Sequence, residues 1–123
     1  MPATTNAALC DILKSDNLIP SPAIERAFRA IDRGNFLTNS NHAYDNRPVK
    51  EGLLHLSAPY IYARAIEELE LVASKSSADK GITVLNVGSG TGYFSSLIAH
   101  VLGRTGSVHG VEVSNVACYQ TCH

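Results

Sequence analysis

Three glycines spaced two residues apart are the residues of this chain best suited to chemistry. Gly88, Gly90 and Gly92 follow an apolar run, a helical run comes next, and a second apolar run carries Glu112. That order predicts a strand, a glycine loop, a helix and a second parallel strand. Bare backbone in the loop can approach a ligand closely, and an acid at the second strand can accept hydrogen bonds from ribose hydroxyls. The pattern therefore predicts a site for a nucleotide-type cofactor.

The equal spacing of the glycines argues against two common phosphate-binding loops. The dinucleotide-binding fingerprint places its third glycine three residues after the second, and a P-loop ends in a Lys-Ser or Lys-Thr pair. Neither pattern is present around Gly92. Two structural alternatives stay open: a tight strand-to-helix turn that binds nothing, and an ordinary solvated acid at Glu112.

Hydrophobic spacing predicts the elements that must position this loop. We expect strands over Thr83–Val87 and 108–113, a helix over Tyr93–Leu102 and a turn over 103–107. The first strand is largely apolar, which is typical of a central strand covered on both faces. Residues 73–81 are small and polar, which predicts a flexible connection.

Three helices are predicted ahead of the first strand. We expect helices over 7–14, from Pro22 to the Arg33-Gly34 pair, and from 59 to about 72, with a surface loop over 35–51 and an extended segment over 52–56. Ser21 and Pro22 are good start signals, and a cation followed by glycine is a good stop signal. Arg29, Asp32 and Arg33 are expected on a solvated helix face.

Composition limits the class of protein. With 123 residues, 45% hydrophobic and 17% charged, the chain should form one globular domain. The net charge of −1 argues against nucleic-acid binding, and no stretch is long and apolar enough for a membrane span or a signal peptide. Three cysteines do not suggest a disulfide framework, so we expect a cytoplasmic location. Cys118, Cys122 and His123 lack a fourth ligand at sensible spacing, so no metal site is predicted.

Three sequence blocks together are the more specific signal. They are residues 27–33 (AFRAIDR), 55–62 (HLSAPYIY) and 85–93 (LNVGSGTGY). In this combination the chain resembles the protein-L-isoaspartate O-methyltransferase family from about Leu9 to Glu112. The resemblance implies an α/β, Rossmann-like class I fold that binds S-adenosyl-L-methionine, here its N-terminal portion: helices followed by a βαβ unit. It also implies methyl transfer to the α-carboxylate of isoaspartyl residues in damaged proteins, a repair reaction.

The resemblance also assigns roles to individual residues. Ser57 would be the active-site serine. The cofactor and substrate cleft would be lined by Leu54, His55, Leu56, Tyr62, Asn86, Gly88, Ser89, Gly90, Gly92 and Glu112. Because a carboxylate is already ionised near neutral pH, Ser57 would orient the acceptor rather than act as a nucleophile. The alternative is that Ser57 caps the helix that begins at Pro59.

Asn86 departs from the family pattern, because the loop usually carries an acid at this position. An amide can accept a hydrogen bond from the cationic amino group of the donor, but without charge assistance. The alternative is a structural amide that ties the loop together.

The strings at 27–34 and 55–59 also resemble the isoaspartate O-methyltransferase domain-containing proteins. In that subgroup the domain is thought to bind the cofactor and to serve as a substrate receptor of a cullin–RING ubiquitin ligase through a C-terminal extension. We expect that this chain lacks such an extension, so ligase docking is not carried over, and ubiquitin-ligase components would be partners only of a full-length form. A catalytic domain, a non-catalytic binding module and an inactive fragment all remain hypotheses.

Two parallel strands alone leave edges and one sheet face uncovered. We therefore expect residues 1–123 to form a single truncated domain, with a helical, substrate-side segment (1–73) and a cofactor-binding unit (82–114). Such a chain should be marginally stable and prone to associate. Isoaspartyl proteins or peptides are the expected partners.

Overall fold

The described part of the protein stacks in layers beside a small parallel sheet. The computed structural model describes residues 2–71 and 81–113. β3 (Thr83–Val87) pairs in parallel with β4 (Ser107–Val111), and α5 (Tyr93–Leu102) connects them and packs against the sheet. The predicted βαβ unit is therefore confirmed, with the second strand shifted by one or two residues.

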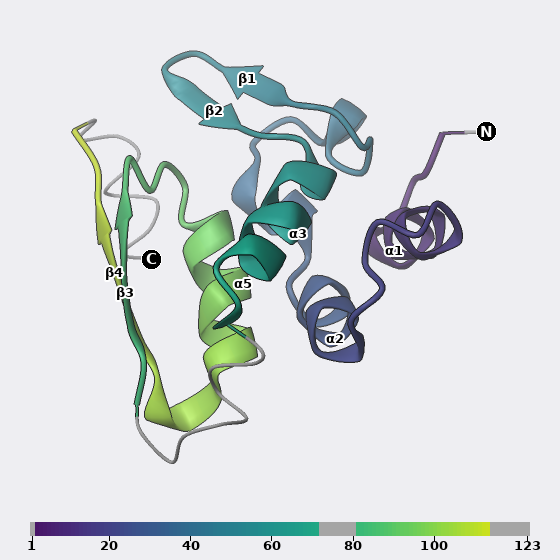
Figure 1. Ribbon diagram of the computed structural model, residues 1–123. Helices are drawn as coiled ribbons and strands as arrows, with labels where there is room; N and C mark the ends of the chain where they lie inside the picture. Colours follow the sequence, from purple (N-terminus) through teal and green to yellow (C-terminus); the bar gives the residue numbers. More distant parts are fainter. Residues whose placement is uncertain (1, 72–80, 114–123) are drawn as a thin grey trace.

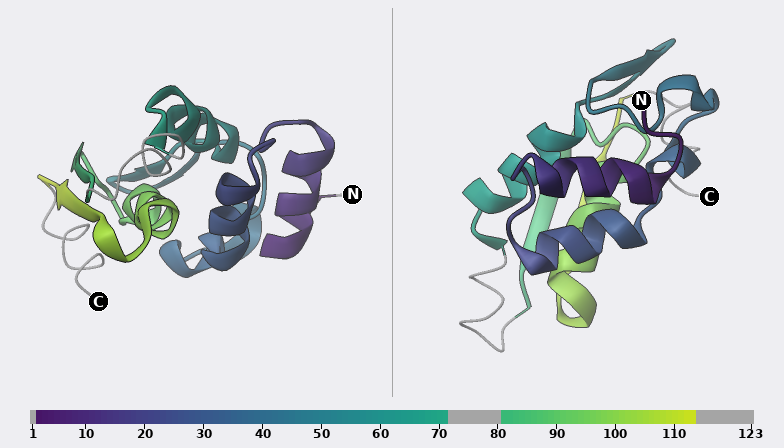
Figure 2. Two further views of the ribbon diagram at one scale, coloured as in Figure 1. Left: turned by 60° about the horizontal axis from the view of Figure 1, so that its bottom comes forward. Right: turned by 90° about the vertical axis from the view of Figure 1, so that its right-hand side faces the viewer.

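Two N-terminal helices complete the layers. α2 (Pro22–Ala30) packs on α5, and α1 (Asn6–Ser15) packs on α2, farthest from the sheet (Figure 1). In the right-hand view of Figure 2, α1 and α2 lie in front of α5. Each helix buries one apolar stripe, because residues three and four apart share a face. The shared core includes Leu9, Leu13, Ile24, Phe28, Leu97 and Ile98.

The predicted end of the second helix is wrong. α2 stops at Ala30, Ile31 is extended, and a 3₁₀ helix, η1, runs over Arg33–Phe36. The Asp32 carboxylate starts η1 by accepting a hydrogen bond from the Gly34 N–H at 2.9 Å. This local cap competes with continuation of the α-helix. It turns Arg33 inward, so Arg33 is fully buried rather than on the expected solvated face.

The segment predicted as a loop holds more structure than expected. η2 (Ser40–His42) lies within it, and β1 (Val49–Glu51) pairs antiparallel with β2 (Leu54–Leu56). The hairpin turn needs Gly52, whose φ is +58°.

Glu51 links β1 to the segment around Thr38 and Asn39. Its carboxylate accepts hydrogen bonds from the Thr38 N–H (3.0 Å), the Thr38 hydroxyl (3.1 Å) and the Asn39 N–H (2.7 Å). Burial by itself would raise the pKa of Glu51, but these hydrogen bonds hold it below its ordinary value.

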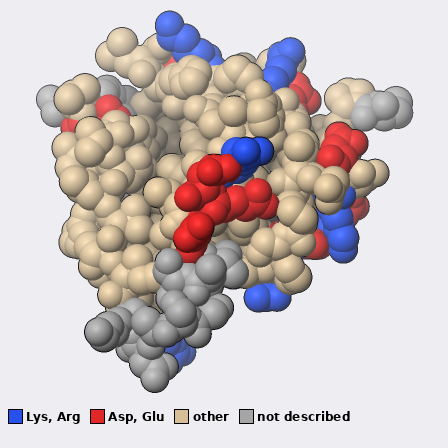
Figure 3. Space-filling view, viewed as in Figure 1, with Lys and Arg blue, Asp and Glu red and all other residues tan. Residues whose placement is uncertain are grey.

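The third helix is shorter than predicted. α3 runs over Pro59–Glu68 with Leu69 as its C-cap. Glu70 then has a left-handed φ of +54°, which breaks the helix before the predicted end near residue 72. In Figure 3 a group of acidic side chains lies near the middle of the viewed face, while Lys and Arg side chains are scattered over it. No helix within 2–71 or 81–113 has the length and apolarity that crossing a membrane requires.

The sheet is covered on one face only in the described part of the chain. α5 covers one face, whereas the other exposes Leu85 (62%), Val87 (75%) and Val111 (51%). The expectation of a strand covered on both faces is thus met on one side only.

Candidate functional site

The glycine loop turns sharply at the carboxyl end of β3. Gly88, Gly90 and Gly92 all have positive φ (+74°, +57° and +90°), a region that side chains other than glycine rarely enter. The N–H groups of Gly88 and Ser89 both donate to the Val111 carbonyl, at 2.7 and 3.0 Å. Alternating glycines are therefore a geometric requirement of this bend, which also places the N-terminus of α5 beside the loop.

The predicted acid lies directly against this loop. Glu112 follows the end of β4, and its Oε2 accepts a hydrogen bond from the Gly90 N–H at 2.8 Å. Its Oε1 accepts from the Val113 N–H at 3.1 Å. A carboxylate has about four lone-pair positions, so both oxygens retain capacity for further donors. Glu112 is therefore half-buried and attached to the loop, while its binding of ribose hydroxyls stays a prediction.

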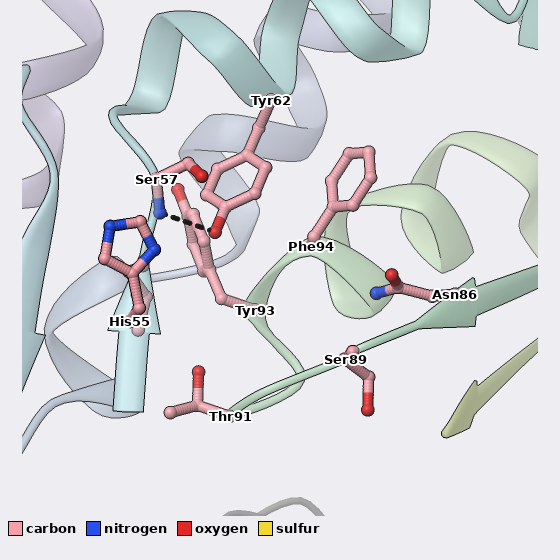
Figure 4. A pocket seen from close by; sticks show the side chains of 10 residues that line it. His55, Ser57, Tyr62, Asn86, Ser89, Thr91, Tyr93 and Phe94 are labelled. Carbon is pink, nitrogen blue, oxygen red and sulfur yellow. Dashed lines mark hydrogen bonds between the residues drawn. The ribbon is translucent and has the colours of Figure 1, made fainter. Parts of the chain in front are cut away.

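The turn that carries Ser57 faces the same loop. A Cβ added at Gly90 would lie 3.8 Å from the His55 carbonyl oxygen, so the end of β2 approaches the bend closely. Between them lies a cavity of about 160 Å³. It is lined by His55, Leu56, Ser57, Tyr62, Asn86, Gly88, Ser89, Thr91, Tyr93 and Phe94. Figure 4 shows side chains from β2, the turn after it, α3, β3, the glycine loop and the start of α5; Ser57, Tyr62 and Tyr93 lie together, whereas the Ser89 side chain points away from them.

Ser57 does not cap α3. The N-cap of α3 is Ala58, and no side chain makes a capping hydrogen bond there. The capping alternative for Ser57 is therefore wrong. The Ser57 backbone N–H instead donates to the hydroxyl of Tyr62 at 2.9 Å, drawn as a dashed line in Figure 4.

Aromatic rings form one wall of the cavity. The Tyr62 ring stacks on Phe94 with 4.9 Å between ring centroids, and it meets Tyr93 edge-on at 5.6 Å. Phe36 meets the other side of the cluster, with its ring 5.4 Å from that of Tyr93. Edge and offset contacts of this kind hold rings in defined orientations.

A buried cation lies behind this wall. The Arg33 guanidinium carbon lies 5.3 Å from the centre of the Tyr93 ring, and Nη2 donates to the Arg47 carbonyl at 3.3 Å. Among the described residues, Arg33 Nε and Nη1 and the Tyr93 hydroxyl have no hydrogen-bond partner. Burial lowers the pKa of Arg33, which nevertheless stays charged, and burial raises the pKa of Tyr93 far above its ordinary value.

Asn86 links the strand to the helix and also lines the cavity. Its Nδ2 donates to the Ser95 hydroxyl oxygen on α5 at 3.0 Å. This bond supports the structural alternative for Asn86. It leaves the amide oxygen without a partner among residues 2–71 and 81–113, so the same side chain is also free to accept a hydrogen bond from a ligand.

Comparison with known proteins decides the family. The sequence model of the protein-L-isoaspartate(D-aspartate) O-methyltransferase family matches residues 4–121. This chain belongs to that family. It is 34% identical over 108 residues to protein-L-isoaspartate O-methyltransferase 1 of Arabidopsis thaliana, covering 87% of this chain and 45% of the relative. It is also 34% identical over 112 residues to the Caenorhabditis elegans protein-L-isoaspartate O-methyltransferase, covering 89% and 46%. The chain thus spans about half the length of these curated relatives.

Solved structures confirm the predicted fold class. A protein-L-isoaspartate O-methyltransferase structure has a TM-score of 0.77 at 31% identity, and the match covers 95% of this chain and 37% of that one. A structure from Plasmodium falciparum, described as a protein-L-isoaspartate O-methyltransferase in complex with S-adenosyl-L-homocysteine, has a TM-score of 0.81 at 21% identity. That match covers 98% of this chain and 54% of that one.

The structure of this methyltransferase-family chain brings most of the predicted site together. Of the predicted residues, those that do not line the cavity are Leu54, Gly90, Gly92 and Glu112. Leu54 is buried at 7% exposure, while the other three shape the loop itself.

Sequence reasoning missed part of the cavity wall. Thr91, Tyr93 and Phe94 line it, and Arg33 supports it from behind. Their position immediately around the last loop glycine was the available signal for the first three. The described residues contain no group of three potential metal ligands, and Cys118, Cys122 and His123 lie outside them.

Proposed function

We propose that this chain binds S-adenosyl-L-methionine and positions it for methyl transfer to the carboxylate of L-isoaspartyl residues in damaged proteins. The observation that carries the proposal is the single cavity shared by Ser57 and the glycine loop, in a chain of the isoaspartate methyltransferase family. In this proposal residues 1–73 form the substrate-side segment and residues 82–114 form the cofactor-binding unit.

The residues present fit the proposed cofactor. The bare backbone at Gly88 and Gly90 leaves room for close approach, and a Cβ at Gly88 would meet nothing within 4 Å. Glu112 supplies a carboxylate for ribose hydroxyls, and Asn86 supplies an amide oxygen for the amino-acid end. The cofactor would supply a methyl group activated by a positively charged sulfur.

The protein's own contribution is positioning. The acceptor carboxylate is ionised near neutral pH, so no general base is needed. The Ser57 hydroxyl can donate a hydrogen bond to one carboxylate oxygen, which leaves the other oxygen free to attack the methyl carbon. The rings of Tyr62, Tyr93 and Phe94 form one wall of the cavity, against which the reacting groups would be held.

A receptor role in a cullin–RING ubiquitin ligase receives no support, because the relatives described above are named as methyltransferases. We propose isoaspartyl proteins as partners. We further propose a cytoplasmic location, supported by the three cysteines and by the buried free thiol of Cys10.

The decisive experiment measures binding and transfer separately. The chain is incubated with methyl-labelled S-adenosyl-L-methionine and an isoaspartyl peptide, and the matched control is the same peptide with an ordinary aspartyl linkage. We expect retained label and base-labile methyl ester on the isoaspartyl peptide only. Retained label without ester would contradict catalysis and favour a binding module, and neither signal would favour an inactive fragment.

A further inference from the structure

The hydroxyl of Tyr62 has a specific task at the turn that precedes α3. Ser57 lies before the helix cap, outside any helix or strand ladder. Its backbone N–H donates to the Tyr62 hydroxyl at 2.9 Å, across five residues of chain. Within the described residues this is the one hydrogen bond made by Ser57, so the position of the turn depends on where Tyr62 stands.

Tyr62 is itself fixed by the opposite half of the site. Its ring stacks on Phe94 at an interplanar angle of 24° and meets Tyr93 at 70°. Both partners begin α5, directly after the last loop glycine. Tyr62 therefore joins two parts that are far apart in sequence: the turn carrying Ser57 and the helix that extends from the glycine loop.

We propose that Tyr62 is a positioning residue, whose hydroxyl sets the location of Ser57 relative to the glycine loop and thereby aligns the acceptor carboxylate with the methyl donor. This inference rests on the proposed function. Methyl transfer needs the attacking oxygen, the methyl carbon and the leaving sulfur in line, and small misplacements are costly. Tyr62 acts through Ser57, so its hydroxyl should affect turnover and leave cofactor affinity unchanged.

Tyr62→Phe tests this directly, because it keeps the stacked ring and removes only the acceptor oxygen. We expect kcat for an isoaspartyl peptide to fall about fivefold, which corresponds to the roughly 1 kcal/mol of one lost neutral hydrogen bond. The affinity for S-adenosylhomocysteine, measured by calorimetry, should stay within about twofold. The matched control is Tyr60→Phe on the same helix, since Tyr60 is 43% exposed and its hydroxyl makes no hydrogen bond in the described part of the chain.

A double-mutant cycle separates positioning from general support of the fold. If Tyr62 acts through Ser57, then Tyr62→Phe should cost nothing further once Ser57→Ala is present, within about twofold. Amide hydrogen exchange gives a readout that needs no turnover: in Tyr62→Phe, exchange at Ser57 should accelerate while exchange in the α5 core does not.

The outcomes are distinct. Wild-type kcat in Tyr62→Phe, additive losses in the cycle, or unchanged exchange at Ser57 would each overturn the inference while leaving the proposed function standing. A parallel loss of cofactor affinity in Tyr62→Phe would overturn it too, because the Tyr62 hydroxyl would then bind the cofactor rather than act through Ser57. If the unmodified chain transfers no methyl group, the proposed function fails first and this inference fails with it.

Discussion

Replacing Asn86 by aspartate should tighten cofactor binding. Asn86 lines the cavity, and its Nδ2 donates to the Ser95 hydroxyl oxygen at 3.0 Å. In Asn86→Asp the serine hydroxyl can reverse and donate to the new carboxylate, so the link to α5 is retained. The free oxygen then meets the cationic amino group of the cofactor with charge assistance. A neutral hydrogen bond contributes about 1 kcal/mol and a charged one about 2 kcal/mol, which predicts roughly fivefold tighter binding.

Calorimetric titration with S-adenosylhomocysteine measures this difference. 5′-Methylthioadenosine serves as the control ligand, since it keeps the adenosine and lacks the amino-acid end that Asn86 would contact. Its affinity should be the same for both proteins. Equal affinities of both proteins for S-adenosylhomocysteine, or equal tightening for the two ligands, would refute a contact between Asn86 and the amino group.

Three further substitutions probe the site and its support. Ser57→Ala should keep cofactor affinity and reduce turnover about thirtyfold, because it removes one hydrogen bond of about 2 kcal/mol to a charged acceptor; unchanged turnover would remove Ser57 from the mechanism. Glu112→Ala should weaken S-adenosylhomocysteine binding about tenfold and lower the free energy of unfolding by about 1 kcal/mol, because the Gly90 N–H loses its acceptor. Calorimetry and thermal melts check both effects. Glu51→Gln should destabilise the fold at neutral pH, and the difference should vanish in acid. The folded-state pKa of Glu51 is depressed, so its contribution is complete above the unfolded pKa and is lost as pH falls through the folded one. Denaturant melts at several pH values would show a constant difference if this reasoning is wrong.

Local signals predicted the βαβ half of the fold almost residue by residue. The run Thr83–Val87, the glycine loop and Tyr93–Leu102 follow from apolar spacing and from backbone that needs positive φ, and the structure reproduces all three. The end of α2 was missed because the cap made by Asp32 competes with the helix only once Gly34 has turned toward it. The extended segment predicted over 52–56 contains β2, but β1 and its pairing with β2 were missed, because a strand of three residues carries almost no periodicity.

Sequence motifs predict Ser57 as a site residue, but they do not show the long-range contacts that hold it. Ser57 belongs to a short sequence block, residues 55–62, that resembles the isoaspartate methyltransferase family. The Tyr62 ring, which holds Ser57 in place, packs on Phe94, about thirty residues further along the chain, and on Tyr93. Tyr93 in turn contacts Arg33, which is buried although its sequence context predicts a solvated helix face. A buried guanidinium with unpaired N–H groups opposes folding unless packing over-determines its place. Here the Arg33 guanidinium lies against the Tyr93 ring, and that ring contacts Tyr62. Arg33, whose burial the local sequence pattern does not predict, therefore supports the aromatic wall that orients Ser57.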